Sequence, residues 1–269
     1  MNVSKTNFVI FRSPKKVLNH NVTLIMNRKA IEQKDHVKYL GILMDQHLNW
    51  KHQVTNVSKK ISRGIGILAK LRGQMNRNLL INIYYCLVYS YLSYGVEAWG
   101  SACQTDLSKI NVLHKKAVRI ITGNQYFQIY GETPGPLPSA DPLFKELKFL
   151  DFKDIYKFNI SKFVFLTLCK MSPLIFHNWF KYAHEVHSHA TRSAVIIISQ
   201  EDPADPGTSF NSYTLFARHS NLENYGRKMI SVSGPLIWNV IPHIIQDSVS
   251  ISTFKTYLKE YYINNYSDV

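Results

Sequence analysis

The sequence predicts an α+β fold that is mostly α-helical. Short β-prone runs are found near the N-terminus, whereas from about residue 49 onward the apolar residues recur every three or four positions. With 269 residues and 45% apolar content, the chain is long enough to bury a substantial core in one large or two smaller domains.

The N-terminal part contains three short β-prone runs. Thr6 to Phe11 and Val22 to Met26 are each followed by turn-forming residues, and Val37 to Met44 is the third run. We expect these strands to form a small sheet at the edge of a larger structure that this chain lacks, which would leave a strand edge exposed. Residues 1–48 are the first predicted domain.

A helix is predicted from about residue 49 to residue 71. Its apolar residues share one face: Val54, Val57, Ile61, Ile65, Leu68 and Leu71. Lys59, Arg63 and Lys70 lie on the opposite face, within about 40° of each other. Gly66 falls on the same basic face, where it either allows the helix backbone to approach a ligand closely or marks a kink. The basic stripe is a candidate phosphate-binding surface, although any amphipathic helix shows the same pattern.

Two further helices complete a predicted basic three-helix unit at residues 49–123. Residues 78–94 are apolar or aromatic nearly all round, which is typical of a buried central helix. The tyrosines of this segment could stack on bases, but core packing is the favoured interpretation. The third helix, 106–122, carries basic residues beside an apolar inner face.

The C-terminal half is predicted to be a separate domain. Residues 124–142 are rich in Pro and Gly and are predicted to form a linker. Residues 143–269 then form a mixed, mainly helical C-terminal domain, in which Trp238, Asn239 and Pro242 are expected to pin a turn of the core.

The positive charge of the chain is concentrated in its first part. Residues 1–123 contain 19 Lys and Arg against 5 Asp and Glu, a net charge of +14, whereas residues 124–269 contain 13 of each. A need for solubility would not place all the excess charge in one part, but a polyphosphate partner would. The asymmetry favours nucleic acid, with an ordinary basic surface as the alternative.

Other compositional features argue against several classes of protein. The three cysteines, Cys86, Cys103 and Cys169, form no C-x-x-C pair and are expected to be reduced thiols buried in the core. No apolar run approaches the ~20 residues that span a bilayer. We therefore expect an intracellular protein without a membrane partner, in either the nucleus or the cytoplasm. The histidines between His177 and His189 match no zinc-finger spacing.

An ordered series of motifs runs through nearly the whole chain. It comprises Lys38-Tyr39-Leu40-Gly41, Leu92-x-Tyr94-Gly95-x-x-x-Trp99-Gly100, Lys115-Lys116-Ala117-x-Arg119 and Gly234-Pro235-x-x-Trp238-Asn239-x-x-Pro242. The series resembles the C-terminal part of a non-LTR (LINE-type, jockey-like) retrotransposon reverse transcriptase, from the end of the palm through the thumb to the C-terminal domain.

The resemblance implies contact with a template-primer duplex of RNA and DNA. The first motif resembles the primer-grip turn of the family, and the basic three-helix unit resembles its thumb. The predicted nucleic-acid-binding residues are Lys38, Tyr39, Gly41, Lys59, Lys60, Arg63, Lys70, Arg72, Lys115, Lys116 and Arg119.

The paired metal-binding aspartates of the family are not expected in this sequence. The intact family enzyme holds two Mg²⁺ ions on paired aspartates, and this sequence contains no adjacent Asp-Asp pair. Asp202 and Asp205 lie near one another in a Pro-rich stretch that does not fit such a site. Lys5 resembles a lysine that is proposed to act on the leaving pyrophosphate, and we expect it to be vestigial. The chain alone is expected to be catalytically inactive and to bind no cofactor.

Three functional hypotheses follow. The first is a truncated reverse transcriptase (RNA-directed DNA polymerase) that retains non-specific nucleic-acid binding. The second is an element-derived protein-interaction or scaffold protein without a nucleic-acid function. The third is half of an enzyme that acts together with a separately encoded palm domain.

Overall fold

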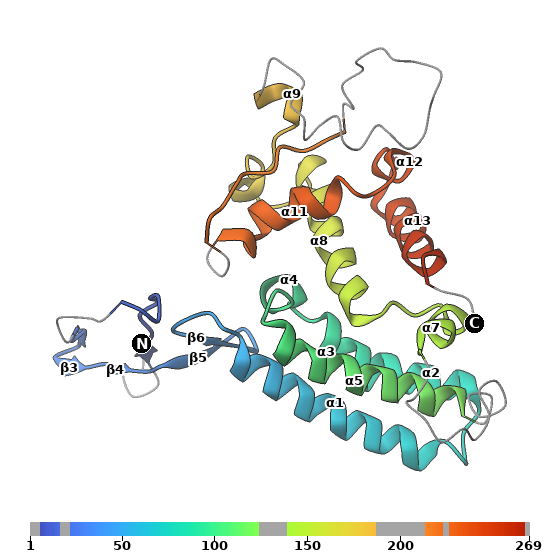
Figure 1. The fold of residues 1–269 in the computed structure, drawn as a ribbon. Helices are drawn as coiled ribbons and strands as arrows, with labels where there is room; N and C mark the ends of the chain where they lie inside the picture. Colours follow the sequence, from blue (N-terminus) through green and yellow to red (C-terminus); the bar gives the residue numbers. More distant parts are fainter. Residues whose placement is uncertain (1–5, 17–21, 124–138, 187–212, 223–225, 267–269) are drawn as a thin grey trace. The chain divides into compact units, whose positions relative to one another are not determined.

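The computed structural model describes residues 6–16, 22–123, 139–186, 213–222 and 226–266. The chain divides into two compact units, unit 1 at Met1–Glu132 and unit 2 at Thr133–Val269. The predicted fold class is confirmed, because helices predominate and the strands of the described residues are short and precede α1 (Figure 1). Most of the predicted linker lies outside the described residues, so the predicted domain boundaries stay a prediction.

The N-terminal strands form three separate pairs. They are β1 (Asn7–Phe8), β2 (Ile25–Met26), β3 (Lys29–Ala30), β4 (Glu32–Gln33), β5 (His36–Tyr39) and β6 (Ile42–Asp45). β1 pairs with β4 in parallel, whereas β2–β3 and β5–β6 are antiparallel hairpins. The prediction of one small sheet is therefore wrong, as is that of a single third strand. Leu40 and Gly41 have positive φ, which closes the run from residue 37 to 44 into a two-residue turn.

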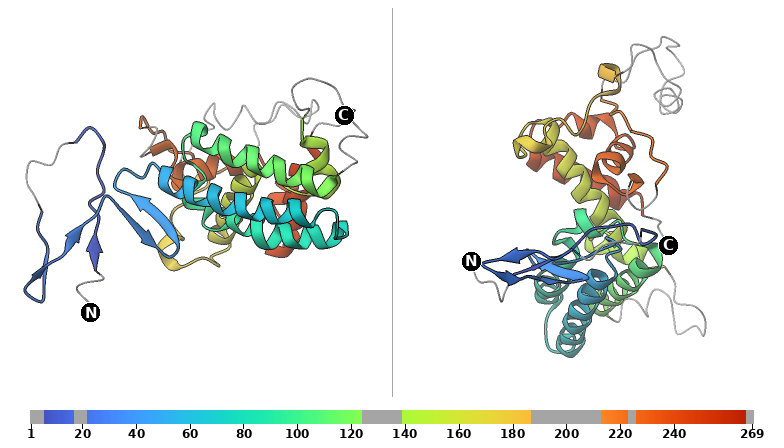
Figure 2. Two further views of the ribbon diagram at one scale, coloured as in Figure 1. Left: turned by 90° about the horizontal axis from the view of Figure 1, so that it is seen from below. Right: turned by 90° about the vertical axis from the view of Figure 1, so that its left-hand side faces the viewer.

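Unit 1 is built mainly from three long helical segments. The helices are α1 (Lys51–Leu71), α2 (Arg77–Tyr84), the π-helical turn η2 (Tyr85–Tyr89), α3 (Ser90–Ser93), α4 (Val96–Trp99) and α5 (Gln104–Thr122). α2, η2 and α3 follow one another without a break, and the Ser90 N–H donates to the Tyr85 carbonyl, as an i to i+5 turn requires. α1 packs against both α5 and this segment (Figure 2).

The buried face of α1 agrees closely with the predicted one. Apart from half-buried Leu71, the predicted apolar residues are buried, and they are joined by Gln53 and Gly64. Gly64 allows the closest approach, because a Cβ built there would lie 2.6 Å from the carbonyl oxygen of Leu87. Gly66 has no neighbouring atom within 4 Å of such a Cβ.

The middle segment of unit 1 departs from its prediction. Within α2, η2 and α3 only Leu80, Tyr84, Val88 and Leu92 are buried, which is a single stripe. Leu79 and Tyr85 are exposed by 41% and 38%. The prediction of a helix buried all round is wrong, because α1 and α5 cover only one side of it.

Unit 2 is organised around one central helix. Its elements are α7 (Asp141–Leu147), α8 (Phe152–Leu168), the 3-10 turn η3 (Leu174–Phe176), α9 (Ala183–Val186), α11 (Ile230–Trp238), α12 (His243–Gln246) and α13 (Ile251–Asn264). α11 and α13 pack against α8. The rings of Phe165 and Phe254 stack with centroids 4.4 Å apart, and Trp238 stacks on Phe254 at 5.8 Å. These rings form much of the core.

Trp238 and Asn239 hold an extended segment against this core. The Trp238 indole is buried and its Nε1 donates to the Tyr213 carbonyl at 3.2 Å. The Asn239 side chain accepts from the Leu215 N–H at 2.8 Å and donates to the Leu215 carbonyl at 2.9 Å. The motif therefore pins a neighbouring extended segment, whereas the prediction was of a turn, and Pro242 directly precedes α12.

The expectation of buried cysteines is wrong. Cys86, Cys103 and Cys169 are all free thiols at exposed positions. Cys86 belongs to the side of η2 that α1 and α5 leave uncovered. Among the described residues, no helix is both long enough and apolar enough to cross a membrane.

Candidate nucleic-acid interface

A buried aspartate joins the β5–β6 hairpin to α1. Asp45 is the last residue of β6 and only 7% exposed. Its carboxylate accepts hydrogen bonds from the backbone N–H groups of His47 at 3.2 Å, Asn49 at 3.1 Å and Trp50 at 2.9 Å. These donors belong to the turn that leads into α1, so the carboxylate fixes the direction in which the helix starts.

Two contacts from α1 hold the strands of the hairpin. The buried Gln53 side chain accepts a hydrogen bond from the Leu43 N–H at 3.0 Å. The rings of His36 and His52 stack with centroids 4.8 Å apart. An isolated two-stranded hairpin is marginally stable in water, and these contacts attach this one to a long helix.

The tip of the hairpin is held by the segment that follows α3. The Tyr94 hydroxyl donates to the Leu40 carbonyl at 2.6 Å. A Cβ built on Gly41 would lie 3.4 Å from the Tyr94 ring, so the turn rests directly on this ring. The two motifs of the resemblance that contain Gly41 and Tyr94 are therefore in contact, although 54 residues separate Leu40 from Tyr94.

Two further contacts fix Tyr94. The Trp99 indole Nε1 donates to the Tyr94 carbonyl at 3.0 Å, and Trp99 is fully buried. Gly95, with φ of +60°, allows Ile42 to pack against the backbone, because a Cβ there would clash with Ile42 Cδ1. Tyr39 and Leu40 remain 64% and 73% exposed. The hairpin thus presents exposed side chains from a fixed backbone.

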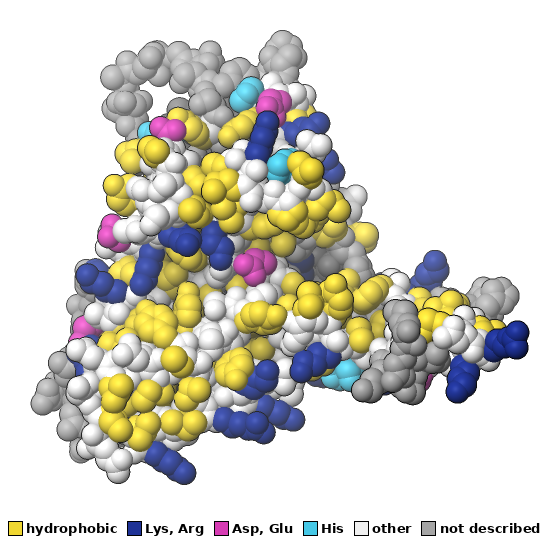
Figure 3. Space-filling model, turned by 180° about the vertical axis from the view of Figure 1, so that it is seen from behind, with side chains coloured by type: hydrophobic (Ala, Val, Ile, Leu, Met, Phe, Trp, Pro, Cys, Tyr) yellow, Lys and Arg dark blue, Asp and Glu magenta, His cyan; other side chains and the backbone are white. Residues whose placement is uncertain are grey.

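The basic stripe predicted on α1 is exposed. Lys59, Arg63 and Lys70 face away from the buried side of the helix, and none of them forms an ion pair with another described residue. α1 contains no acidic residue along its 21 residues. In Figure 3, Lys and Arg side chains line the lower edge of the view, and hydrophobic side chains gather beside them at the lower left. Unscreened cations on one helix face make a surface that attracts phosphates.

The other predicted residues have less uniform surroundings. Lys38, Tyr39 and Gly41 are exposed on the hairpin, as are Arg72 after α1 and Lys116 on α5. Three of the predicted residues are only half-exposed: Lys60, Lys115 and Arg119. The Lys60 Nζ lies 4.9 Å from the centre of the Tyr91 ring, a cation–π contact within unit 1.

Comparison with known proteins gives several partial matches. A probable RNA-directed DNA polymerase from the transposon X-element of Drosophila melanogaster is 28% identical over 134 residues, which is 47% of this chain and 14% of that protein. The RNA-directed DNA polymerase from the mobile element jockey of the same species is 29% identical over 106 residues, 38% of this chain and 12% of the relative. The jockey polymerase of Drosophila funebris is 28% identical over 105 residues.

This chain contains a region related to jockey-type RNA-directed DNA polymerases. The resemblance to non-LTR retrotransposon reverse transcriptases is thereby confirmed at the level of sequence. The matched region spans between 11% and 14% of the length of these relatives. No family model and no solved structure matches this chain.

Among the described residues, no group of three or more His, Cys, Asp or Glu is placed to hold a metal ion. Asp202, Asp205 and the candidate Lys5 lie outside these residues, as do His187 and His189. We assign no metal-dependent step to the described residues.

Several residues that shape the interface were missed by reasoning from the sequence. From the sequence, Tyr94 is named only as a member of a motif, and neither Asp45 nor Gln53 is singled out. Gln53 lies one position before the buried Val54, and its place on the apolar face was the available signal. Gly64 was overlooked in favour of Gly66 because periodicity marks a face and does not reveal what packs on it.

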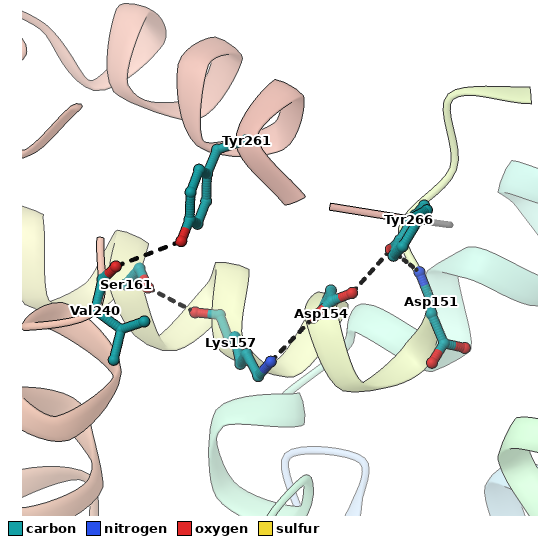
Figure 4. A network of polar contacts seen from close by, with 7 residues as sticks. All are labelled: Asp151, Asp154, Lys157, Ser161, Val240, Tyr261 and Tyr266. Atoms are coloured by element: carbon teal, nitrogen blue, oxygen red, sulfur yellow. Dashed lines mark hydrogen bonds and ion pairs between the residues drawn. The ribbon is translucent and has the colours of Figure 1, made fainter. Parts of the chain in front are cut away.

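Unit 2 has a concave site of its own. A pocket of about 550 Å³ is lined by residues of α8, α11 and α13 and by neighbouring residues. Tyr266 Oη accepts from the Asp151 N–H at 2.7 Å and donates to Asp154 Oδ2 at 2.9 Å, while Lys157 pairs with Asp154 at 3.2 Å (Figure 4). Burial, followed by the charge of Asp154, raises the pKa of Tyr266. The lining also includes the apolar residues Leu236 and Ile237.

Proposed function

We propose that this chain binds nucleic acid, as a template-primer duplex of RNA and DNA, without sequence preference. The proposed surface is the basic stripe of α1, with Lys60, Arg72 and the α5 residues Lys115, Lys116 and Arg119 beside it. The β5–β6 hairpin, with Lys38, Tyr39 and Gly41, is the proposed contact at one end. A basic surface that contacts the phosphates recognises a duplex by its shape and charge and makes no base-specific contacts.

The observation that carries the proposal is the exposed stripe of Lys59, Arg63 and Lys70 on a helix without acidic residues. Two further facts support it. The excess positive charge of the chain lies in residues 1–123, and the relatives are polymerases that by name use RNA to direct DNA synthesis. Binding, without nucleotide addition, is what we propose for this chain alone.

Fluorescence anisotropy of the full chain on a labelled RNA–DNA duplex tests the proposal. Replacing Lys59, Arg63 and Lys70 by Glu together is expected to weaken binding equally for duplexes of unrelated sequence. It should also reduce the slope of log Kd against log salt concentration by about 2 to 3, because each lost phosphate contact removes about one released counterion.

A matched control changes the same net charge elsewhere. Replacing Lys153, Lys181 and Lys255, which are exposed in unit 2, by Glu should leave the salt slope close to that of the unmodified chain. Equal weakening by both triple variants, or an affinity that hardly depends on salt, would contradict binding through unit 1.

A protein-interaction role is the second candidate. It is favoured by exposed apolar side chains near the pocket of unit 2, where Leu236, Val240 and Ile244 are 55%, 69% and 71% exposed. Under this role, the charge reversals on α1 would leave function intact, whereas Val240→Asp and Ile244→Asp would abolish the complex. The two triple variants and these two substitutions therefore distinguish the candidates. The separately encoded palm domain stays a further possible partner, which co-expression with such a domain would test.

A further inference from the structure

The tip of the β5–β6 hairpin combines exposure with unusual restraint. Tyr39 and Leu40 are 64% and 73% exposed. Both turn residues, Leu40 and Gly41, have positive φ, at 45° and 85°. Left-handed backbone is costly for leucine, so this turn needs external support to persist.

That support comes from one side chain. The Tyr94 hydroxyl donates to the Leu40 carbonyl at 2.6 Å, and its ring lies under Gly41. The Tyr94 backbone is in turn fixed by the buried Trp99, whose Nε1 donates to its carbonyl at 3.0 Å. Tyr94 is itself 56% exposed, so its hydrogen bond contributes little to the core and mainly determines where the hairpin tip lies.

We infer that Tyr94 is a positioning residue for nucleic-acid binding, which holds the exposed hairpin tip in the conformation that contacts the duplex. The inference rests on the proposed function and adds to it a residue, Tyr94, that affects binding only by positioning Tyr39. A loop that is already ordered before binding loses less conformational entropy when its ligand arrives, so the benefit of Tyr94 is expressed as affinity. Because Tyr94 donates to a backbone carbonyl and not to a phosphate, it should not affect the salt dependence of binding.

The decisive variant is Tyr94→Phe, which removes the hydroxyl and keeps the ring. It should lower the affinity of the full chain for the RNA–DNA duplex by roughly 3- to 10-fold at every salt concentration, the value of one hydrogen bond. The salt slope and the melting temperature should stay close to those of the unmodified chain. Tyr91→Phe is the matched control, because it removes a hydroxyl three residues earlier that is not bonded to the hairpin, and its affinity should stay within about twofold.

A double-mutant cycle separates positioning from a general structural role. Tyr39→Ala should weaken binding, and adding Tyr94→Phe to it should have little further effect if Tyr94 acts through the tip. Hydrogen exchange without nucleic acid should be faster at Gly41 and Ile42 in Tyr94→Phe. Unchanged affinity in Tyr94→Phe, or additive losses in the double variant, would overturn the inference while leaving binding through α1 intact. Absence of binding by the unmodified chain would overturn both, even if the exchange rates changed as expected.

Discussion

The Tyr84 hydroxyl and His114 Nε2 lie 2.7 Å apart in the core of unit 1, where both side chains are almost completely buried. Their rings are nearly parallel, with an angle of 8° between them. The contact joins α2 to α5 beneath the proposed binding surface. The core of the three-helix unit therefore contains a polar pair among its apolar side chains.

This pair predicts a stability that depends on pH. Burial, followed by the charge of Lys115, lowers the pKa of His114 from 6.5 to about 3. Between these values the unfolded chain binds a proton that the folded chain does not. The free energy of unfolding should therefore be highest above pH 6.5 and should fall as the pH decreases toward 3, by up to about 1.4 kcal/mol per pH unit.

Hydrogen exchange of the α5 amides between pH 7.5 and 5 measures this dependence, after correction for the intrinsic exchange rates. The control is His114→Gln, which keeps a polar partner for Tyr84 and should flatten the dependence even if it lowers stability overall. Parallel curves for the two proteins would show that another group is responsible.

Two glycines on α1 predict opposite effects of the same substitution. Gly64→Ala should destabilise unit 1 by about 1 to 3 kcal/mol, because the added Cβ would be forced against the Leu87 carbonyl. Gly66→Ala, in open space on the same helix, should stabilise the protein by about 0.5 to 1 kcal/mol through helix propensity. Urea unfolding of both variants checks the pair. If the two changes had the same sign, the packing of α1 on η2 would differ from that described.

We expect the loss of the Asp45 carboxylate, which joins the hairpin to α1, to lower the free energy of unfolding substantially. Asp45→Ala removes the acceptor for three backbone N–H groups and should destabilise unit 1 by about 1 to 3 kcal/mol. Asp35→Ala removes the same charge from an exposed position nearby and should change stability by less than about 0.5 kcal/mol. Comparable losses in urea unfolding would mean that charge, and not hydrogen bonding, accounts for the effect.

In unit 2 the corresponding test concerns two tyrosines of the C-terminal segment. Tyr266→Phe breaks the link between the Asp151 N–H and the Asp154 carboxylate and should cost about 1 to 3 kcal/mol. Tyr261→Phe removes only an exposed 3.4 Å contact with the Val240 carbonyl and should cost less than about 0.5 kcal/mol. Thermal unfolding of the full chain and of each variant, followed by circular dichroism, measures the two shifts in Tm. Equal shifts in Tm would contradict the network drawn in Figure 4.

The sequence predicted best where one face of an element had to be buried. α1 has a clear apolar stripe, and both its extent and its exposed basic side could be inferred from spacing alone. The segment from residue 78 to 94 is apolar on every side, so its pattern could not indicate which stripe would pack, and the uncovered face was missed. His114 could have been assigned to the core, because it follows Ile110 by four residues on the inner face of α5.

The arrangement of the hairpin was less accessible to such reasoning. Its turn depends on positive φ at Leu40, and a leucine in a sequence does not indicate this conformation. The turn also depends on a contact with Tyr94, which lies more than 50 positions away. The resemblance singled out the motifs that contain Gly41 and Tyr94, but it did not indicate that these two motifs are in contact. The candidate nucleic-acid-binding residues themselves stay predictions, which the charge-reversal and Tyr94 variants address.

The π-helical turn η2 sets the rotational phase of everything that follows it on the same segment. Residues four apart drift by about 40° per step around an ideal α-helix, so Leu80, Tyr84, Val88 and Leu92 would not form one straight stripe without a wider turn. If the same residues formed a regular α-helix, with no wider turn between Tyr85 and Tyr89, Tyr94 would be rotated by about 100°. The wider turn, and not only the composition of the segment, thus determines whether the hairpin tip is supported.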